Sequence, residues 1–288
     1  MSFIIVTDTS ANLPREYLEA QHIRTASFSY TVRGKEPGPF DGHEFYEAMR
    51  RGALVRTSLI SPQKYGSLFR SALAEGADVL YVGMSSGISN SMYCAVMAAQ
   101  EAAEEYPERT IRTVDTLGAS LGEGLLVIEA AACRDRGMDV TQTAEHLNAL
   151  RRRMCQVFTV DDLAYLKRGG RLSSAAAIVG TVLQIKPLLK GDGDGKIVAF
   201  GKSRGRKRAV EALAERYEAL VEAPETQTVG IAHADCEEDA SSLAALLRRS
   251  RPPKDILTVL YEPVTGSHVG PGTLALFFLG GEGVRSAF

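Results

Sequence analysis

The sequence has little cysteine, no long hydrophobic run and no excess of either charge. Its cysteines form no C-x-x-C pair, and this predicts reduced, mostly buried thiols in a cytosolic protein. No apolar run reaches the ~18–20 residues of a membrane-spanning helix, and the first residues show no signal pattern. A formal charge of −2 and a pI near 6.3 argue against a general nucleic-acid binder. We therefore expect a cytoplasmic protein with no nucleic-acid partner and no stable membrane insertion. The four cysteines are Cys94, Cys133, Cys155 and Cys236.

Local motifs for metals and nucleotides are missing as well. There is no H-x-x-x-H, no Cys/His cluster and no EF-hand loop, so we predict no metal. The run GDGDGK at 191–196 lacks the spacing of a phosphate-binding loop and is interpreted as a hairpin turn. Without a nucleotide loop or a metal motif, the chain is not expected to phosphorylate a substrate by itself, and no cofactor is predicted.

The first half of the chain alternates short apolar strands with helices. This pattern is typical of parallel strands joined by helical crossovers, whose ligands bind beyond the carboxyl ends of the strands. Thr7–Ser10, Ser85–Asn90 and Asp115–Thr116 follow three of the predicted strands. A further strand is expected over 23–32, and the segment containing Thr57 is expected to be a polar loop before a helix capped by Ser61. The predicted strands are 3–6, 78–82 and 110–114, and the predicted helices are 44–51, 63–74, 91–105, 119–135 and 140–153.

The pattern changes after residue 153. Strands over 156–160, 187–190, 197–200, 229–233, 255–261 and 273–279 are mixed with helices over 162–167, 174–183, 204–222 and 236–250, and 264–271 is expected to be a loop. The 288 residues suffice for two ordinary domains. We expect an α/β fold with a Rossmann-like parallel-sheet α/β/α domain over 1–153 and a mixed-sheet α/β domain over 154–288.

One turn carries most of the chemical information. The run GMSSGISNS at 83–91 lies between a predicted strand and a predicted helix. Hydroxyl groups and free backbone N–H groups at a helix N-terminus suit an anion, and this interpretation is favoured. The run also contains G-x-S-x-G, so a hydrolase with Ser85 as nucleophile and His268 as base stays an alternative. A plain helix cap with spare serines is the third possibility.

Two glycine-rich segments in the second half are also candidates. LKRGGRLS at 166–173 combines Gly170 with cations such as Arg171, which can clamp a carboxylate or phosphate, although a basic surface turn is nearly as plausible. In GSHVGPG at 266–272, the glycines would let His268 approach a ligand closely and donate a hydrogen bond. A purely structural role for this histidine is equally open.

Taken together, the motifs resemble those of the DegV family. The resemblance runs in order along nearly the whole chain. The family pattern S-G-T-Y is Ser89-Asn90-Ser91-Met92 in this sequence, so asparagine stands where the family has glycine. The matching segments are TDTSANLP at 7–14, TS and SP around 57–62, SSGISNS at 85–91, VDDL and LKRGGR within 160–171, IKPL at 185–188, and GSHVGPG at 266–272.

The resemblance implies a protein that binds a long-chain fatty acid in a tunnel between two α/β domains. Such bacterial proteins serve as the binding subunit of a fatty acid kinase and present the carboxylate to a separate ATP-dependent subunit, which makes acyl phosphate for phospholipid synthesis. It implies no catalysis by this chain alone. A carrier for another carboxylated lipid or an isoprenoid is a weaker alternative. The implied carboxylate-binding residues are Thr57, Ser58, Ser86, Ser89, Asn90 and His268, with Gly170 and Arg171 supporting the mouth or facing the partner.

Overall fold

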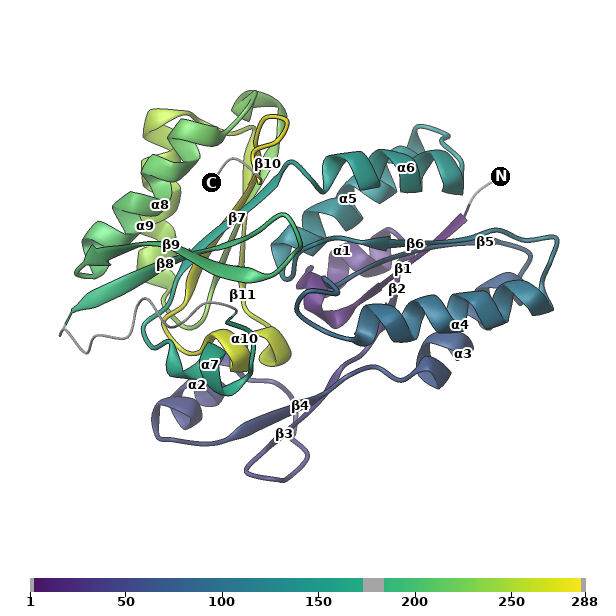
Figure 1. Ribbon diagram of the computed structural model, residues 1–288, viewed down its shortest axis with the longest axis horizontal. Helices are drawn as coiled ribbons and strands as arrows, with labels where there is room; N and C mark the ends of the chain where they lie inside the picture. Colours follow the sequence, from purple (N-terminus) through teal and green to yellow (C-terminus); the bar gives the residue numbers. More distant parts are fainter. Residues whose placement is uncertain (1–2, 173–183, 286–288) are drawn as a thin grey trace. The chain divides into compact units, whose positions relative to one another are not determined.

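The computed structural model describes residues 3–172 and 184–285, so the helix expected over 174–183 lies outside the described residues. The chain forms two compact units (Figure 1). Unit 1 comprises Met1–Ser29 and Thr57–Arg151, and unit 2 comprises Tyr30–Arg56 and Arg152–Phe288. The hydrophobic pattern gives no sign that residues 30–56 group with unit 2, and the proposed domain boundary at residue 153 stays a prediction.

Unit 1 is built on a four-stranded sheet in which all strands run parallel, as the alternating pattern predicted. The strand expected over 23–32 is divided, because the chain leaves the sheet after Ala26, and Phe28 N donates to Thr9 Oγ1 at 3.2 Å instead of continuing the ladder. Its second part, β3 (Ser29–Val32), pairs with β4 (Val55–Ser58) in a separate two-stranded sheet. The strand order is β2 (Arg24–Ala26), β1 (Phe3–Asp8), β5 (Asp78–Gly83) and β6 (Ile111–Asp115).

Helices cover both faces of this sheet, with α3 and α4 on one side and α5 and α6 on the other (Figure 1). Val79 and Tyr81, two positions apart on β5, belong to the same core cluster as Tyr65 and Phe69 of α3. Burial on both faces explains why the strands are nearly continuous apolar runs. The predicted start of α3 is confirmed, because Ser61 accepts a hydrogen bond from Lys64 N at 3.4 Å. The helices are α1 (Arg15–Ala20), α3 (Pro62–Ala74), α4 (Ser91–Glu105), α5 (Leu121–Asp135) and α6 (Val140–Leu150), with the short 3-10 helix η1 (Thr9–Ala11) after β1.

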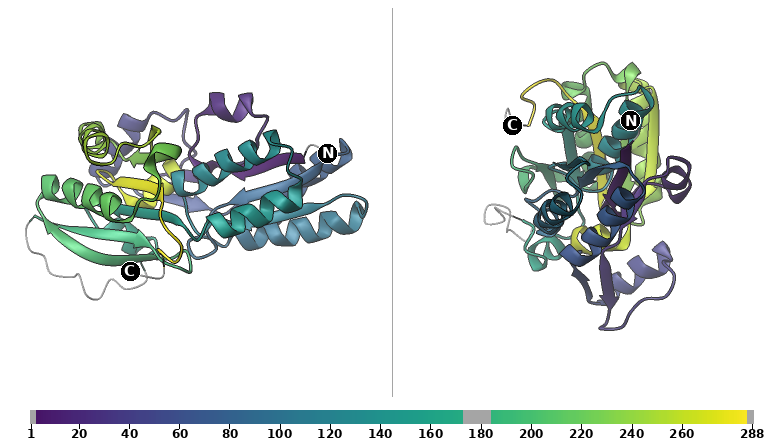
Figure 2. Two further views of the ribbon diagram at one scale, coloured as in Figure 1. Left: turned by 90° about the horizontal axis from the view of Figure 1, so that it is seen from above. Right: turned by 90° about the vertical axis from the view of Figure 1, so that its right-hand side faces the viewer.

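Unit 2 contains a six-stranded mixed sheet, which confirms the second half of the predicted fold class. The GDGDGK run is a hairpin turn, where the Asp192 carboxylate accepts hydrogen bonds from Asp194 N and Lys196 N. Helix α8 (Arg206–Leu220) packs on this hairpin, as the view from above shows (Figure 2). The strand order is β11 (Asp255–Leu260), β10 (Thr228–His233), β12 (Leu274–Leu279), β7 (Met154–Thr159), β8 (Ile185–Gly191) and β9 (Ile197–Arg204).

The loop expected over 264–271 is wrong, because Pro263–Val269 forms the helix α10. The Glu262 side chain accepts hydrogen bonds from Val264 N at 2.6 Å and Thr265 N at 2.5 Å, and a proline occupies the first helical position. Gly270 then ends the helix with a φ of +85°. The loop was predicted from the glycine content of the segment, and the helix-starting Glu262–Pro263 pair and the helix-ending Gly270 were not recognised. The other helices are α2 (Gly42–Arg50), α7 (Ala164–Arg168) and α9 (Glu237–Ser250), together with the 3-10 helix η3 (Pro224–Thr226).

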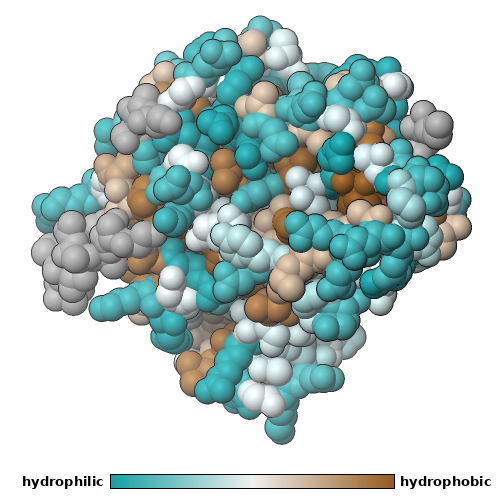
Figure 3. Space-filling model, turned by 45° about the vertical axis from the view of Figure 1, so that its right-hand side comes forward, coloured by the Kyte–Doolittle hydropathy of each residue, from teal (hydrophilic) through white to brown (hydrophobic). Residues whose placement is uncertain are grey.

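Hydrophilic residues predominate on the face drawn in Figure 3, with hydrophobic residues scattered among them. No helix among the described residues has the length and hydropathy needed to cross a bilayer. All four cysteines are free, and the thiols of Cys133 and Cys155 are buried. Among large apolar side chains, Tyr93 and Met97 stand out because they are more than half exposed one turn apart on α4.

Candidate functional site

The turn between β5 and α4 is held together by Ser85. Its side chain is fully buried, its Oγ accepts a hydrogen bond from Gly87 N at 3.1 Å, and its carbonyl accepts from Ile88 N and Ser89 N at 3.0 Å each. A nucleophilic serine must instead present its hydroxyl to a substrate. The geometry therefore makes Ser85 a structural residue of the turn.

Ser89 lies two residues before the first residue of α4, and its hydroxyl keeps a hydrogen available for donation. Its Oγ accepts a hydrogen bond from Ser91 N at 3.2 Å, so this hydroxyl acts as acceptor there, and the side chain is half-buried. The 15-residue helix that follows has no acidic residue in its first turn, so its dipole favours an anion at this end. Asn90 has helical backbone angles, is exposed and makes no side-chain capping bond. The predicted anion-binding end of the helix thus centres on Ser89.

Ser86 has a different role from the one its position suggests. Its Oγ donates to Asp115 Oδ2 at 2.6 Å, and its backbone N–H also points at this carboxylate, 3.3 Å away. Because the hydroxyl hydrogen is directed at Asp115, Ser86 fixes the turn to the end of β6. Asp115 is thereby a positioning residue, and its place directly after a predicted strand is the only sign of this in the sequence.

Thr57 and Ser58 lie on β4, so their expected placement in a polar loop is wrong. The four residues of β4 alternate between half-buried and exposed positions where the strand pairs with β3, so Thr57 is half-buried and Ser58 is exposed. Just after this strand, Ile60 N donates to Ser91 Oγ at 3.1 Å. The structure therefore attaches the segment that follows Thr57 to the same helix end that carries Ser89.

A buried carboxyl pair lies behind this end of the sheet. Asp8, at the end of β1, accepts hydrogen bonds from Tyr81 OH at 2.8 Å, Met84 N at 3.2 Å and Ser10 N at 2.9 Å. Glu123 of α5 is fully buried, and its Oε1 accepts a hydrogen bond from Thr7 Oγ1 at 3.1 Å. The network ties β1, β5 and α5 to the start of the 83–91 turn. Sequence reasoning missed Glu123, which appears only as one acid in an Ala/Leu-rich helix.

The geometry of this pair requires a bound proton. Ser10 Oγ lies 2.5 Å from both Asp8 Oδ1 and Glu123 Oε2, yet a hydroxyl has one hydrogen to donate. One of the two acids must therefore donate in return. Burial raises the pKa of both groups, and the pKa of Glu123 is raised well above its usual value by burial and by the neighbouring Asp8. We therefore expect Glu123 to be the carboxyl that holds the proton.

His268 is the central candidate residue of unit 2. It lies on α10, which packs against α7, and a Cβ added to Gly169 would come within 2.5 Å of its Nδ1. Burial, followed by the nearby Arg171 guanidinium, lowers the pKa of His268 to about 4. The imidazole is therefore neutral near pH 7, with one ring nitrogen that donates a hydrogen bond and one that accepts.

The glycine pair shapes the neighbouring turn. Gly169 allows the close approach of His268, and Gly170 is exposed with a φ of +70°. Arg171 is half-buried and donates from its guanidinium to the Gly169 carbonyl. The structure thus brings the two glycine-rich candidate segments of unit 2 together. In unit 1, it brings together Ser86, Ser89, Asn90 and the segment after Thr57.

Comparisons with known proteins cover almost the whole chain. The family model described as an uncharacterised protein of the DegV family matches residues 2–280. A DegV domain-containing protein of Clostridium perfringens is 36% identical over 283 residues, which are 96% of this chain and 97% of that protein.

Solved structures are similar over the same extent. A fatty-acid-binding DegV family protein of Thermus thermophilus is 30% identical, with a TM-score of 0.89 over 97% of this chain and 100% of that one. One of Streptococcus agalactiae, also described as fatty acid binding, is 28% identical, with a TM-score of 0.82 over 98% of this chain and 100% of that one. The parallel four-stranded sheet and the mixed six-stranded sheet are the DegV fold, and this chain belongs to the DegV family.

Proposed function

We propose that this protein binds a long-chain fatty acid and holds its carboxylate at the N-terminus of α4. The proposal rests on the hydroxyl group of Ser89. Its oxygen accepts a hydrogen bond from Ser91 N, so its hydrogen can be donated to an anion. The first turn of α4 contains no acidic residue that would repel this anion. The relatives from Thermus thermophilus and Streptococcus agalactiae, 30% and 28% identical, are described as fatty acid binding, which supports this ligand class.

Thr57 and Ser89 in unit 1 and the neutral His268 in unit 2 are the proposed donors to the carboxylate. Hydrogen bonds to a charged group contribute about 1.5–3 kcal/mol each. Burial of about 14 methylenes at ~0.8 kcal/mol each contributes about 11 kcal/mol before the costs of binding. The acyl chain therefore supplies most of the affinity, and the donors fix the position of the carboxylate.

The proposed role of the complex is to present the carboxylate to a separate fatty acid kinase, which transfers a phosphoryl group from ATP. In this proposal the chain orients the carboxylate oxygens and performs no covalent step, which agrees with the burial of the Ser85 hydroxyl. Because the partner needs ATP, the reaction is assigned to the cytoplasm. Arg171 and the exposed Gly170 are proposed to face the partner.

Binding is tested first on the protein purified from cells. Native mass spectrometry should show a bound long-chain fatty acid, and delipidated protein should take up palmitate. Ser89→Ala should weaken palmitate binding about 10- to 100-fold, the equivalent of one hydrogen bond to a charged group. Ser67→Ala is a matched control, because this exposed serine of α3 bonds only to the Gln63 carbonyl nearby. A protein that neither carries nor takes up a fatty acid would contradict the proposal.

Presentation is tested with the kinase partner and ATP. The wild-type complex should yield acyl phosphate, and Ser89→Ala and His268→Gln should abolish the product without changing the circular dichroism spectrum. A fluorophosphonate probe should leave Ser85 unlabelled. Covalent labelling of this serine would favour the hydrolase alternative and overturn the binding function.

A further inference from the structure

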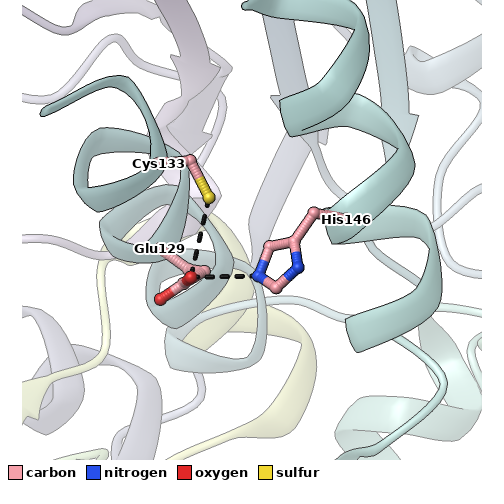
Figure 4. A group of neighbouring side chains, drawn as sticks. All are labelled: Glu129, Cys133 and His146. Carbon is pink, nitrogen blue, oxygen red and sulfur yellow. Dashed lines mark hydrogen bonds and ion pairs between the residues drawn. The ribbon is translucent and has the colours of Figure 1, made fainter. Parts of the chain in front are cut away.

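Three side chains with metal-ligating atoms meet between α5 and α6, in a part of unit 1 that the proposed fatty-acid site does not use. Glu129 and Cys133 lie one turn apart on α5, and His146 lies on α6. Figure 4 shows the three side chains pointing toward one another. His146 Nε2 is 3.0 Å from Glu129 Oε1, and Cys133 Sγ is 3.6 Å from the same oxygen. The three ligand atoms all lie within 4.8 Å of one another.

The two distances to Glu129 Oε1 are close to those between ligand atoms around a tetrahedral zinc ion. With Zn–S near 2.3 Å and Zn–N or Zn–O near 2.0–2.1 Å, neighbouring ligand atoms lie roughly 3.3–3.6 Å apart. The sulfur–oxygen distance of 3.6 Å already agrees, and the nitrogen–oxygen distance of 3.0 Å needs a shift of a few tenths of an ångström. We propose that Glu129, Cys133 and His146 form a binding site for Zn²⁺, with water as the fourth ligand.

The donor set also selects the class of ion. A thiolate, an imidazole and a carboxylate together suit zinc, whereas calcium and magnesium take oxygen ligands alone. Cys133 is fully buried, while the side chains of Glu129 and His146 are 29% and 40% exposed. The site is therefore anchored in the packing between the helices and open at its outer edge, where an ion and a water can enter.

The guanidinium of Arg136 competes with a metal ion for Glu129 and Cys133. Its guanidinium lies 2.8 Å from Glu129 Oε1 and 3.1 Å from Cys133 Sγ, and its side chain is 54% exposed. An exposed ion pair of this kind is weak, and the guanidinium can rotate into solvent. On binding, Zn²⁺ replaces this cation and the thiol proton, which goes to water. The thiolate and the carboxylate then balance the two charges of the ion, and the neutral imidazole adds none.

The test uses Co²⁺ as a spectroscopic probe on the reduced, chelator-treated full-length protein. One equivalent of Co²⁺ should produce a thiolate-to-cobalt charge-transfer band and strong tetrahedral visible bands, and Zn²⁺ should remove both. Cys133→Ser should abolish the charge-transfer band, and Cys94→Ser, which changes a cysteine of α4, should retain it. His146→Ala, a change at a side chain that is 40% exposed, should weaken Co²⁺ binding at least tenfold.

Arg136→Ala separates a metal site from a simple ion-pair cluster. Removing the competing guanidinium should tighten Co²⁺ binding several-fold, whereas a cluster that exists only for the ion pair would show no Co²⁺ signal in any variant. The site is overturned if wild-type protein gives no charge-transfer band, or if the band survives in Cys133→Ser. If Cys133→Ser fails to fold, the His146 and Arg136 variants still decide, because Arg136 is exposed and the His146 side chain is only partly buried.

Discussion

At the scale of single residues, the Asp8–Glu123 pair makes stability depend on pH in an unusual direction. The pKa of Glu123 is raised well above its usual value, so the stability from its protonated form is complete below the ordinary pKa of ~4.3 and is lost as pH rises toward the folded value. The free energy of unfolding should fall between pH 5 and pH 8 through this group, by at most ~1.4 kcal/mol per pH unit. Glu123→Gln does not titrate, so its stability relative to wild type should rise over this range.

Urea denaturation at pH 5, 6.5 and 8 measures this effect. Glu123→Leu is the matched comparison, because it removes the whole carboxyl group and leaves the buried hydroxyls of Ser10 and Thr7 without this hydrogen-bond partner, at a cost of about 2–4 kcal/mol at every pH. A Glu123→Gln curve that stays parallel to the wild-type curve would show that the carboxyl is ionised in the folded protein.

His268 gives the opposite dependence. Because its pKa is lowered to about 4, the stability from its neutral form is present above the ordinary value of ~6.5 and is lost as pH falls toward 4. In ligand-free protein, His268→Gln should reduce the acid-induced loss between pH 6.5 and pH 4 by up to about 3 kcal/mol. An NMR titration of the imidazole checks the cause directly, and a His268 that protonates near pH 6.5 would refute it.

At the scale of elements, the end of α10 determines where His268 lies. Gly270 has a φ of +85°, and a Cβ at this position would overlap the ring of Tyr165. Gly270→Ala should therefore lower the free energy of unfolding by about 2–3 kcal/mol, through backbone strain and the steric clash. Gly205→Ala, at a φ of +83° with open space around the new Cβ, should cost only about 1 kcal/mol. Equal losses in the two variants in thermal unfolding would exclude the contribution of Tyr165.

The start of α4 is joined to the β4–α3 connection by one buried hydrogen bond. Ser91 is fully buried, and Ser91→Ala would leave Ile60 N–H without this acceptor, at a cost of about 1–3 kcal/mol. Amide hydrogen exchange at Ile60 should also become faster, because the segment loses its attachment to the helix. Unchanged exchange at this amide, together with unchanged stability, would mean that the bond does not hold the connection.

At the scale of the whole molecule, fatty-acid affinity should follow the length of the acyl chain. Each added methylene that is buried contributes ~0.8 kcal/mol, so the Kd should fall about fourfold per carbon until the chain outgrows its site. A titration of C10, C12, C14 and C16 acids measures this slope, with thermal stabilisation as a second readout. An affinity that is independent of length would mean that only the carboxylate is bound.

Much of the fold could be predicted because local signals agree with the tertiary structure. The apolar runs of β1, β5 and β6, the Ala-rich α4 and the Ser61–Pro62 start of α3 each have a cause within a few residues. Two elements whose own residues carry only weak strand or helix signals, β4 and α10, were not predicted. β4 forms only because β3 pairs with it, and α10 is a short helix whose glycines resemble those of a loop.

The sequence by itself determined the parallel sheet, the turn at 83–91 and the order of the family motifs, because hydrophobic periodicity and capping residues act over short distances. Only the tertiary structure brings the Glu123 carboxyl into contact with Ser10, 113 residues away, and the His146 ring into contact with Glu129. Helical crossovers bring residues from distant parts of the chain to one place, so burial and the partners of a buried charge depend on the packed structure. A proton on a buried carboxyl and a cluster of metal-ligating atoms have no local pattern, and packing alone decides both.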